Sequence, residues 1–150
     1  MLHDIRSAQN VGSLFRTADA AGIGEIYLVG ITPTPIDKYG RPNTSVTKTA
    51  LGAENTISWK YVATLAPLLK RLQKEGYTSI AIEQAPASVD YKKVIMTTPI
   101  VFVLGNEVTG LPERVLSKMD IIAEISMKGE KESLNVSVAG GIAMFRILNV

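Results

Sequence analysis

Three polar clusters interrupt otherwise apolar stretches of this 150-residue chain, and they hold the side chains best suited to chemistry. Arginine, carboxylate and amide groups can bind a small ligand, orient it and assist the transfer of a proton. These residue types therefore indicate a ligand site with an arginine and a glutamate nearby, but they do not identify a reaction. The clusters are Asn10 with Arg16, Asn106 with Glu107, and Ser133 with Asn135.

Each of these residues also has a purely structural interpretation. Asparagine and serine are good helix N-caps, so Asn10, Ser133 and Asn135 could each begin a helix. Arg16 lies three residues before Asp19 and could form a surface ion pair with it. Glu107 could belong to a surface ion pair as well. The residue types alone leave both interpretations open.

The surrounding elements alternate between strands and helices, which predicts an α/β fold with a mainly parallel sheet. Pro67 must lie in the first turn of its helix, so that helix should begin near Thr64. Two of the polar clusters follow the carboxyl ends of strands, where open α/β sheets bind ligands. Helices are expected over residues 10–21, 62–74, 112–118 and 136–148, and strands over residues 25–31, 79–83, 99–104 and 121–125.

Two further segments have more than one interpretation. The polar stretch 37–49 is expected as a long loop, in which Lys38 and Arg41 beside Tyr39 could hold RNA or simply face water. The last helix is apolar over too much of its circumference for the surface of a monomer. It is expected to be buried inside the fold or against a second subunit.

Composition predicts one folded domain over residues 1–150, because 46% of the residues are apolar and 20% are charged. The absence of cysteine excludes a thiol nucleophile and a thiolate metal site, and it fits a cytoplasmic protein. The only histidine, His3, is expected to be exposed near a mobile end, which argues against histidine catalysis and a histidine metal site. No metal is therefore expected. No run of about 18 apolar residues predicts a membrane span.

Common catalytic and nucleotide-binding motifs are missing. The chain has no G-x-G-x-x-G, no G-x-x-x-x-G-K-[ST] and no G-x-S-x-G segment. The usual dinucleotide loop, the triphosphate loop and the hydrolase nucleophile elbow are thus absent. The net charge of +2 is compatible with nucleic-acid binding but does not require it.

Three ordered segments cover almost the whole chain. They are Asn10-x-Gly12-x-x-x-Arg16-Thr17-Ala18, Leu104-Gly105-Asn106-Glu107-x-x-Gly110-Leu111, and Ile125-x-Met127-x-Gly129-x-x-x-Ser133-Leu134-Asn135-Val136-Ser137-Val138-Ala139. In order, spacing and residue type they resemble the three motifs of the SpoU (TrmH-type) RNA 2′-O-ribose methyltransferases. Ser126 departs from the family, which usually has proline there; we expect the change to affect loop rigidity more than chemistry.

The resemblance implies a parallel α/β sheet whose carboxyl-terminal segment is threaded into a deep trefoil knot. It also implies S-adenosylmethionine as cofactor and a homodimer with its active site near the interface. This would account for the apolar last helix. The residues implied in cofactor binding are Leu104, Gly105, Asn106, Ile125, Met127, Ser133, Leu134 and Asn135.

The implied reaction is methyl transfer to a ribose 2′-hydroxyl of tRNA or rRNA. Arg16 is the family's proposed general base, although arginine stays protonated at accessible pH, so it could instead clamp a phosphate. Asn10 would position Arg16 or the ribose, and Glu107 would fix the motif loops or orient a catalytic group. Ser133 and Asn135 would shape the site. The implied catalytic residues are thus Arg16, Asn10, Glu107, Ser133 and Asn135.

RNA recognition would rest on dispersed basic groups or on a partner, because the chain begins almost at the first motif and resembles a bare catalytic domain. Two other functions stay open. The protein could be a non-catalytic RNA-binding module of the same fold, or a small-molecule α/β enzyme. The basic groups available for RNA are Lys38, Arg41, Lys92, Lys93, Lys128 and Lys131.

Overall fold

The described residues, 1–96 and 99–150 of a computed structural model, form parallel strands in two groups, ordered β3-β2-β1 and β6-β4-β7-β5. The groups meet where β1 passes the end of β6. There the Leu104 N–H donates to Met1 O at 3.0 Å, and the His3 N–H donates to Leu104 O at 2.8 Å. The strands are β1 (Leu2–His3), β2 (Glu25–Val29), β3 (Ser58–Val62), β4 (Thr78–Ile82), β5 (Val89–Asp90), β6 (Ile100–Val103) and β7 (Ile121–Glu124).

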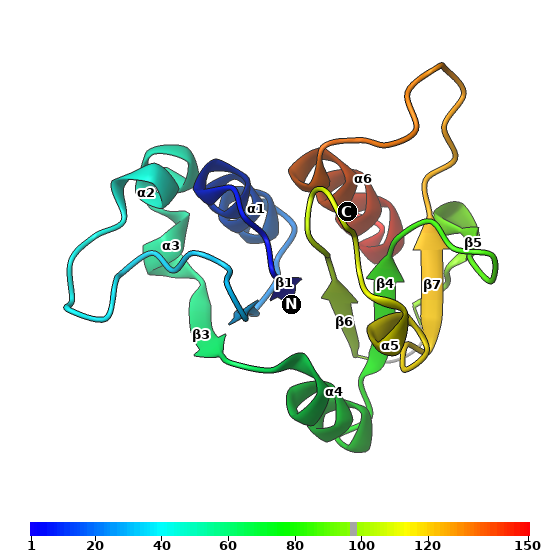
Figure 1. Cartoon of the computed structure of the whole chain (residues 1–150), viewed down its shortest axis with the longest axis horizontal. Helices are drawn as coiled ribbons and strands as arrows, with labels where there is room; N and C mark the ends of the chain where they lie inside the picture. The colour runs from blue at the N-terminus through cyan, green and yellow to red at the C-terminus, as the bar shows by residue number, and fades with distance from the viewer. Residues whose placement is uncertain (97–98) are drawn as a thin grey trace.

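Helices cover both faces of this sheet (Figure 1). Alternate strand residues point to opposite faces, so Leu28 packs with the α1 and α6 side chains while Val29 packs with those of α4 and α5. Helices α2 and α3 extend the first layer beside α1. The helices are α1 (Ala8–Ala20), α2 (Thr44–Ala50), α3 (Ala53–Thr56), α4 (Leu65–Lys74), α5 (Glu113–Leu116) and α6 (Val136–Leu148), with a 3₁₀ turn at Tyr91–Lys93.

Close packing of α6 against α1 depends on a small residue. A Cβ atom added at Gly140 would lie 2.8 Å from Leu14 Cδ2 and 2.9 Å from Leu104 Cδ1. Leu14 and Leu104 are both fully buried, so an added methyl group would have to displace core side chains. Glycine at this position therefore lets α6 lie directly over the junction of β1 and β6, next to the start of the second motif.

The structure confirms the expected fold class, a parallel α/β sheet flanked by helices. The last helix has the predicted bounds, Val136–Leu148, and α4 begins at Leu65, as Pro67 requires. The remaining predicted strands and helices occur within a few residues of their expected ends. The trefoil knot stays a prediction of the resemblance.

Three expectations were wrong. The stretch 37–49 is not all loop, because Asn43 caps helix α2 and accepts the Ser45 N–H. Strand β3 (Ser58–Val62) was not predicted, and it contains Val62, which the sequence assigned to the stripe of the following helix. His3 is only 8% exposed, because it lies in β1 rather than at a mobile end.

Membrane insertion through a helix is not indicated by the structure. In the part of the chain that is described, none of the helices has both the length and the apolar character needed to cross a bilayer.

Candidate cofactor and active site

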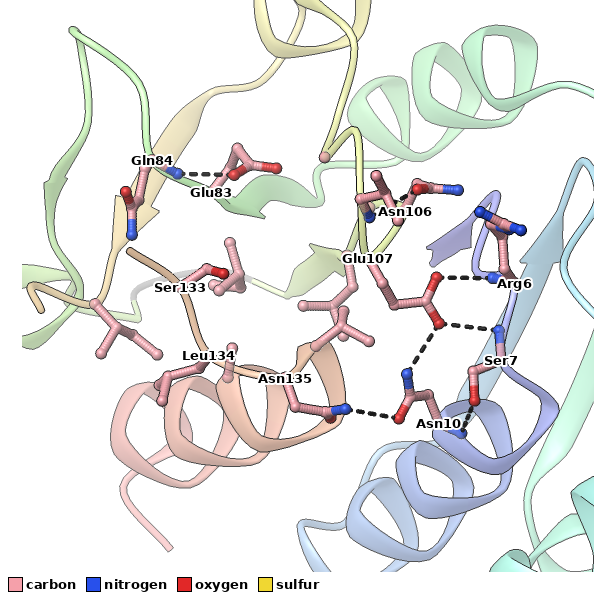
Figure 2. A pocket seen from close by; sticks show the side chains of 18 of the residues that line it. Arg6, Ser7, Asn10, Glu83, Gln84, Asn106, Glu107, Ser133, Leu134 and Asn135 are labelled. Atoms are coloured by element: carbon pink, nitrogen blue, oxygen red, sulfur yellow. Dashed lines mark hydrogen bonds between the residues drawn. The ribbon is translucent and has the colours of Figure 1, made fainter. Parts of the chain in front are cut away.

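A cavity of about 600 Å³ opens where β1, β4, β6 and β7 end, at the carboxyl edge of the sheet (Figure 2). Side chains from all three sequence motifs line it, together with residues that follow β4. This is the edge at which open α/β sheets place ligands, as the sequence predicted. The predicted cofactor residues that line it are Leu104, Gly105, Asn106, Ile125, Met127, Ser133, Leu134 and Asn135, and the predicted catalytic residues Asn10 and Glu107 join them.

Glu107 is the central hydrogen-bond acceptor on the polar side of the cavity. Its Oε2 accepts the Arg6 N–H at 2.8 Å, and its Oε1 accepts the Ser7 N–H and the Asn10 Nδ2–H at 2.9 Å each. The Arg6 and Ser7 N–H groups lie at the start of helix α1, whose N-cap is Ser7. A carboxylate is stable there because N–H donors and the positive end of the helix dipole converge on it.

The third motif joins this group of hydrogen bonds through Asn135. The Asn135 Nδ2–H donates to Asn10 Oδ1 at 3.0 Å, while Asn135 Oδ1 accepts the Ser137 N–H at 2.9 Å. Asn135 therefore caps α6 with one end of its amide and contacts the first motif with the other. The structure confirms the cap interpretation of this residue, and its role toward a ligand stays a prediction.

The second motif forms a tight turn whose backbone lines the cavity. Asn106 Nδ2–H donates to Asp4 O at 2.8 Å, and Asn106 Oδ1 accepts the Val108 N–H at 2.9 Å. A Cβ at Gly105 would lie 2.7 Å from the Gly110 carbonyl carbon, so only glycine fits there. The turn thus brings the backbone itself close to whatever occupies the cavity.

The pKa of Glu107 reflects two opposed influences. Partial burial raises it, but the hydrogen bonds from Arg6, Asn10 and Ser7 outweigh the burial, and the pKa is lowered below its ordinary value. Glu107 is therefore a carboxylate at neutral pH with both oxygens occupied. It is a weak base, suited to holding the polar side of the cavity in shape.

Arg16 is not part of this cavity. It lies six residues beyond Asn10 on α1, exposed to solvent, and lines a separate hollow of about 390 Å³ with Thr49 and Phe145. The ion pair with Asp19 does not form; Asp19 Oδ1 instead accepts the Thr56 Oγ–H at 2.8 Å. Within one chain, Arg16 and the other predicted catalytic residues are on different surfaces.

A family model described as the SpoU rRNA methylase family matches residues 1–145 of the chain. The chain belongs to this family. Among curated relatives, it is similar to the 23S rRNA (guanosine-2′-O-)-methyltransferase RlmB of Pseudomonas aeruginosa, with 33% identity over 147 residues. That match covers 98% of this chain and 56% of the relative. The SpoU-family chain therefore spans about half the length of the curated relatives it matches.

Solved structures agree with this assignment. An AdoMet-bound rRNA methyltransferase from Sinorhizobium meliloti is 30% identical and superposes with a TM-score of 0.87, covering 99% of this chain and 54% of that one. A TrmH/SpoU tRNA modifying enzyme from A. aeolicus is 26% identical, with a TM-score of 0.85 and coverage of 99% and 72%. The SpoU fold therefore accounts for nearly the whole chain.

Four polar residues that line the SpoU-family cavity were not singled out from the sequence: Arg6, Ser7, Glu83 and Gln84. Glu83 Oε2 accepts the Leu111 N–H at 2.9 Å, which fixes the end of the second motif. The Gln84 Nε2–H donates to Glu132 O at 2.8 Å, which ties down the loop before Ser133. Their position directly after β4 was the available signal, since polar residues at that edge face the site.

Proposed function

We propose that residues 1–150 are one catalytic domain that transfers a methyl group from S-adenosylmethionine to a ribose 2′-hydroxyl of tRNA or rRNA. The observation that supports this proposal most directly is the continuous chain of hydrogen bonds Glu107–Asn10–Asn135. It joins all three motifs around one cavity. Structural capping alone gives no reason for Asn10 to contact both other motifs, because Ser7 is the N-cap of α1.

The cavity fits the proposed cofactor in size and chemistry. At about 600 Å³ it is within the range of pockets that enclose small ligands. Leu104, Ile125, Met127 and Leu134 offer apolar contact to a purine and a thioether-like chain, and the Gly105 turn offers backbone hydrogen-bonding groups. When bound, S-adenosylmethionine supplies a methyl group on a positively charged sulfur.

The reaction requires an in-line arrangement of oxygen, carbon and sulfur. The residues around the cavity would hold the cofactor so that its methyl group passes to the ribose 2′-oxygen and a neutral thioether is left, and the hydroxyl proton would pass to a general base, for which Arg16 is the candidate. Asn10 and Asn135 orient the ribose from fixed positions. Glu107 holds Asn10 and is not the proton acceptor, since its lowered pKa and occupied oxygens make it a poor base.

In this proposal Arg16 takes part in the reaction only in a dimer, where it reaches the cavity of the second copy of the chain. The outer face of α6 exposes Val138, Ile142 and Phe145, at 49%, 37% and 38%. Phe145 lines the same hollow as Arg16. A homodimer that covers this apolar face would bring Arg16 of one subunit toward the cavity of the other, as base or as phosphate clamp.

RNA would be held outside the cavity by basic groups. Tyr39 is 69% exposed, and Lys38 Nζ and Arg41 Cζ each lie 5.0 Å from its ring centroid. This arrangement offers an exposed aromatic ring with two basic groups close to it, one of which, Arg41, also pairs with Asp37. Ribosomal and transfer RNA as substrates also make the cytoplasm the expected place of action.

The test is methyl transfer from labelled S-adenosylmethionine to total RNA, with the wild type beside Arg16→Ala. The proposal predicts label in RNA for the wild type only, and fractionation of the RNA then identifies the substrate. Cofactor binding without any transfer would point to a missing RNA substrate or partner protein. Absence of both cofactor binding and transfer would reject the methyltransferase.

A further inference from the structure

A second cavity, of about 460 Å³, passes through the plane of the sheet next to Met1. It is lined mostly by apolar side chains and lies at the amino end of the strands, away from the proposed active site. Side chains from both faces of the sheet line it. Leu14 and Met144 belong to the α1/α6 face, whereas Leu72 and Val101 belong to the α4/α5 face.

An opening shared by both faces requires an interruption of the sheet, and the strand pairing shows one. Strand β2 pairs with β3 along its whole length, from Glu25 to Val29. On its other side, β2 pairs with β1 only at Leu28 and Val29. The inner edge of β2 from Glu25 to Tyr27 therefore has no strand beside it among the described residues.

Strand β6 is open in the same place from the opposite side. It pairs with β4 from Ile100 to Val103. Toward β1, its first contact is Phe102 O, which accepts the Met1 N–H at 2.6 Å. The edge before Phe102 faces the cavity, so β2 and β6 flank a space in line with β1.

We propose that this space, the β1 slot, binds one short extended apolar segment that continues β1 on the amino side of Met1 and pairs in parallel with β2 and β6. The pairing of Leu2 with Leu28 sets the register. If it continues, Met1 lies opposite Tyr27, and three further residues lie opposite Ile26, Glu25 and Gly24.

The chemistry of the occupant follows from the walls of the slot. Successive residues of a central parallel strand meet apolar side chains on both faces, so all three positions should be apolar. A charged group is disfavoured, as the Met1 amine illustrates: burial lowers its pKa to about 5. An amide at that position would carry the same hydrogen bond to Phe102 O without any charge to desolvate.

The test fuses Ile-Val-Leu directly before Met1 in the full chain and compares it with Gly-Ser-Gly and Ile-Pro-Leu fusions. Only Ile-Val-Leu can both fill the slot and donate every ladder hydrogen bond, because proline lacks the N–H. We expect it to raise Tm by several degrees and to slow amide hydrogen exchange at Tyr27 and Phe102, whose edges face the slot. The other two fusions should do neither.

Three results would overturn the proposal. Equal stabilisation by Ile-Val-Leu and Ile-Pro-Leu would show that the added residues act by surface contact and not as a strand. Unchanged exchange at β2 and β6 with Ile-Val-Leu would show that the slot stays open. Protection of these strands in the unextended chain that rises with protein concentration would assign the slot to a second copy.

Discussion

Glu107 shows at the residue scale how one carboxylate can connect distant segments of the chain through hydrogen bonds. Its carboxylate accepts hydrogen bonds from three N–H groups, those of Arg6, Ser7 and Asn10. These residues lie about one hundred positions earlier in the chain. The amide in Glu107→Gln has the same shape but carries one acceptor fewer and two added donors. At least one of the three donors must then lose its partner.

We predict that Glu107→Gln lowers the free energy of unfolding by about 1–3 kcal/mol, the cost of an unsatisfied donor at a partly buried site. Affinity for S-adenosylmethionine should fall with it. Urea unfolding and calorimetric titration measure the two effects. Glu130→Gln, an exposed glutamate in the loop after β7, is the matched control. Equal stability of the Glu107 and Glu130 variants would contradict the role of Glu107 as the central hydrogen-bond acceptor.

Acid should remove this contribution in the wild type. Because the folded-state pKa of Glu107 is lowered, its stabilisation is complete above the ordinary glutamate value near pH ~4.3 and is lost as pH falls through the folded-state pKa. The stability difference between wild type and Glu107→Gln should therefore stay constant from neutral pH down to about pH 4.3 and narrow below it. Urea unfolding from neutral pH to about pH 3 measures it, and a difference that stays constant over the whole range would count against the hydrogen-bonded carboxylate.

The sequence predicted residue types at this site better than their partners. The sequence identified Asn135 as either a helix cap or a ligand-binding residue. The structure shows a cap that also donates a hydrogen bond to Asn10. The partners of Glu107 could not be read locally, since two of them are backbone N–H groups that any residue would supply. Arg6 and Ser7 were missed for that reason.

At the scale of elements, helix α6 depends on two adjacent glycines in different surroundings. A Cβ at Gly140 meets the buried Leu14 and Leu104 at 2.8 Å and 2.9 Å, whereas a Cβ at Gly141 meets only Thr17 Cγ2 at 3.4 Å. Alanine has the same helix propensity at both positions, so the propensity gain cancels in a comparison. The difference between the two variants isolates the packing of α6 over β1 and β6.

We predict that Gly140→Ala is less stable than Gly141→Ala by about 1–3 kcal/mol, which is the usual cost of overpacking a core. Because α6 begins at the cofactor cavity, Gly140→Ala should also weaken cofactor binding, while Gly141→Ala should preserve it. Chemical unfolding and cofactor titration on both variants provide the measurement. Equal stability would show that Leu14 and Leu104 can move aside.

Elements were predictable where one pattern dominated. The apolar run of β6 and the apolar stripe of α4 gave their positions directly. Strand β3 was missed because its residues, Ser58 to Val62, are mostly polar or amphipathic and only partly buried. Helix α2 was missed because only two of its residues, Val46 and Ala50, are buried, one helical turn apart. The serine, threonine and lysine around them give the segment no clear apolar pattern.

At the scale of the whole molecule, Arg16 raises the question of how one active site is assembled. Sequence order placed Arg16 and Asn10 in one motif, and helical geometry then separated them, because six residues on a helix span about 9 Å along its axis. Neither sequence nor a single chain reveals which surface a second copy covers. The exposed apolar face of α6 beside Arg16 is the argument for a shared site.

Subunit complementation tests this arrangement directly. Arg16→Ala and Glu107→Gln should each abolish most methyl transfer as homodimers. In a mixed dimer of the proposed kind, one cavity keeps its own Glu107 and receives Arg16 from the other subunit, while the second cavity lacks both. Random exchange makes half of the dimers mixed, so an equal mixture should regain about a quarter of wild-type activity.

The opposite outcome is equally informative. If Arg16 served the cavity of its own chain, every site in the mixture would lack one of the two residues, and mixing would restore nothing. Coexpression of the two variants, with mass spectrometry to measure the mixed species, ensures that exchange has occurred.

Phe145→Glu, which places a charge on the apolar face of α6, should shift the protein toward monomer in sedimentation and remove methyl transfer while cofactor binding persists. Persistent dimer with full activity in that variant would place the interface elsewhere.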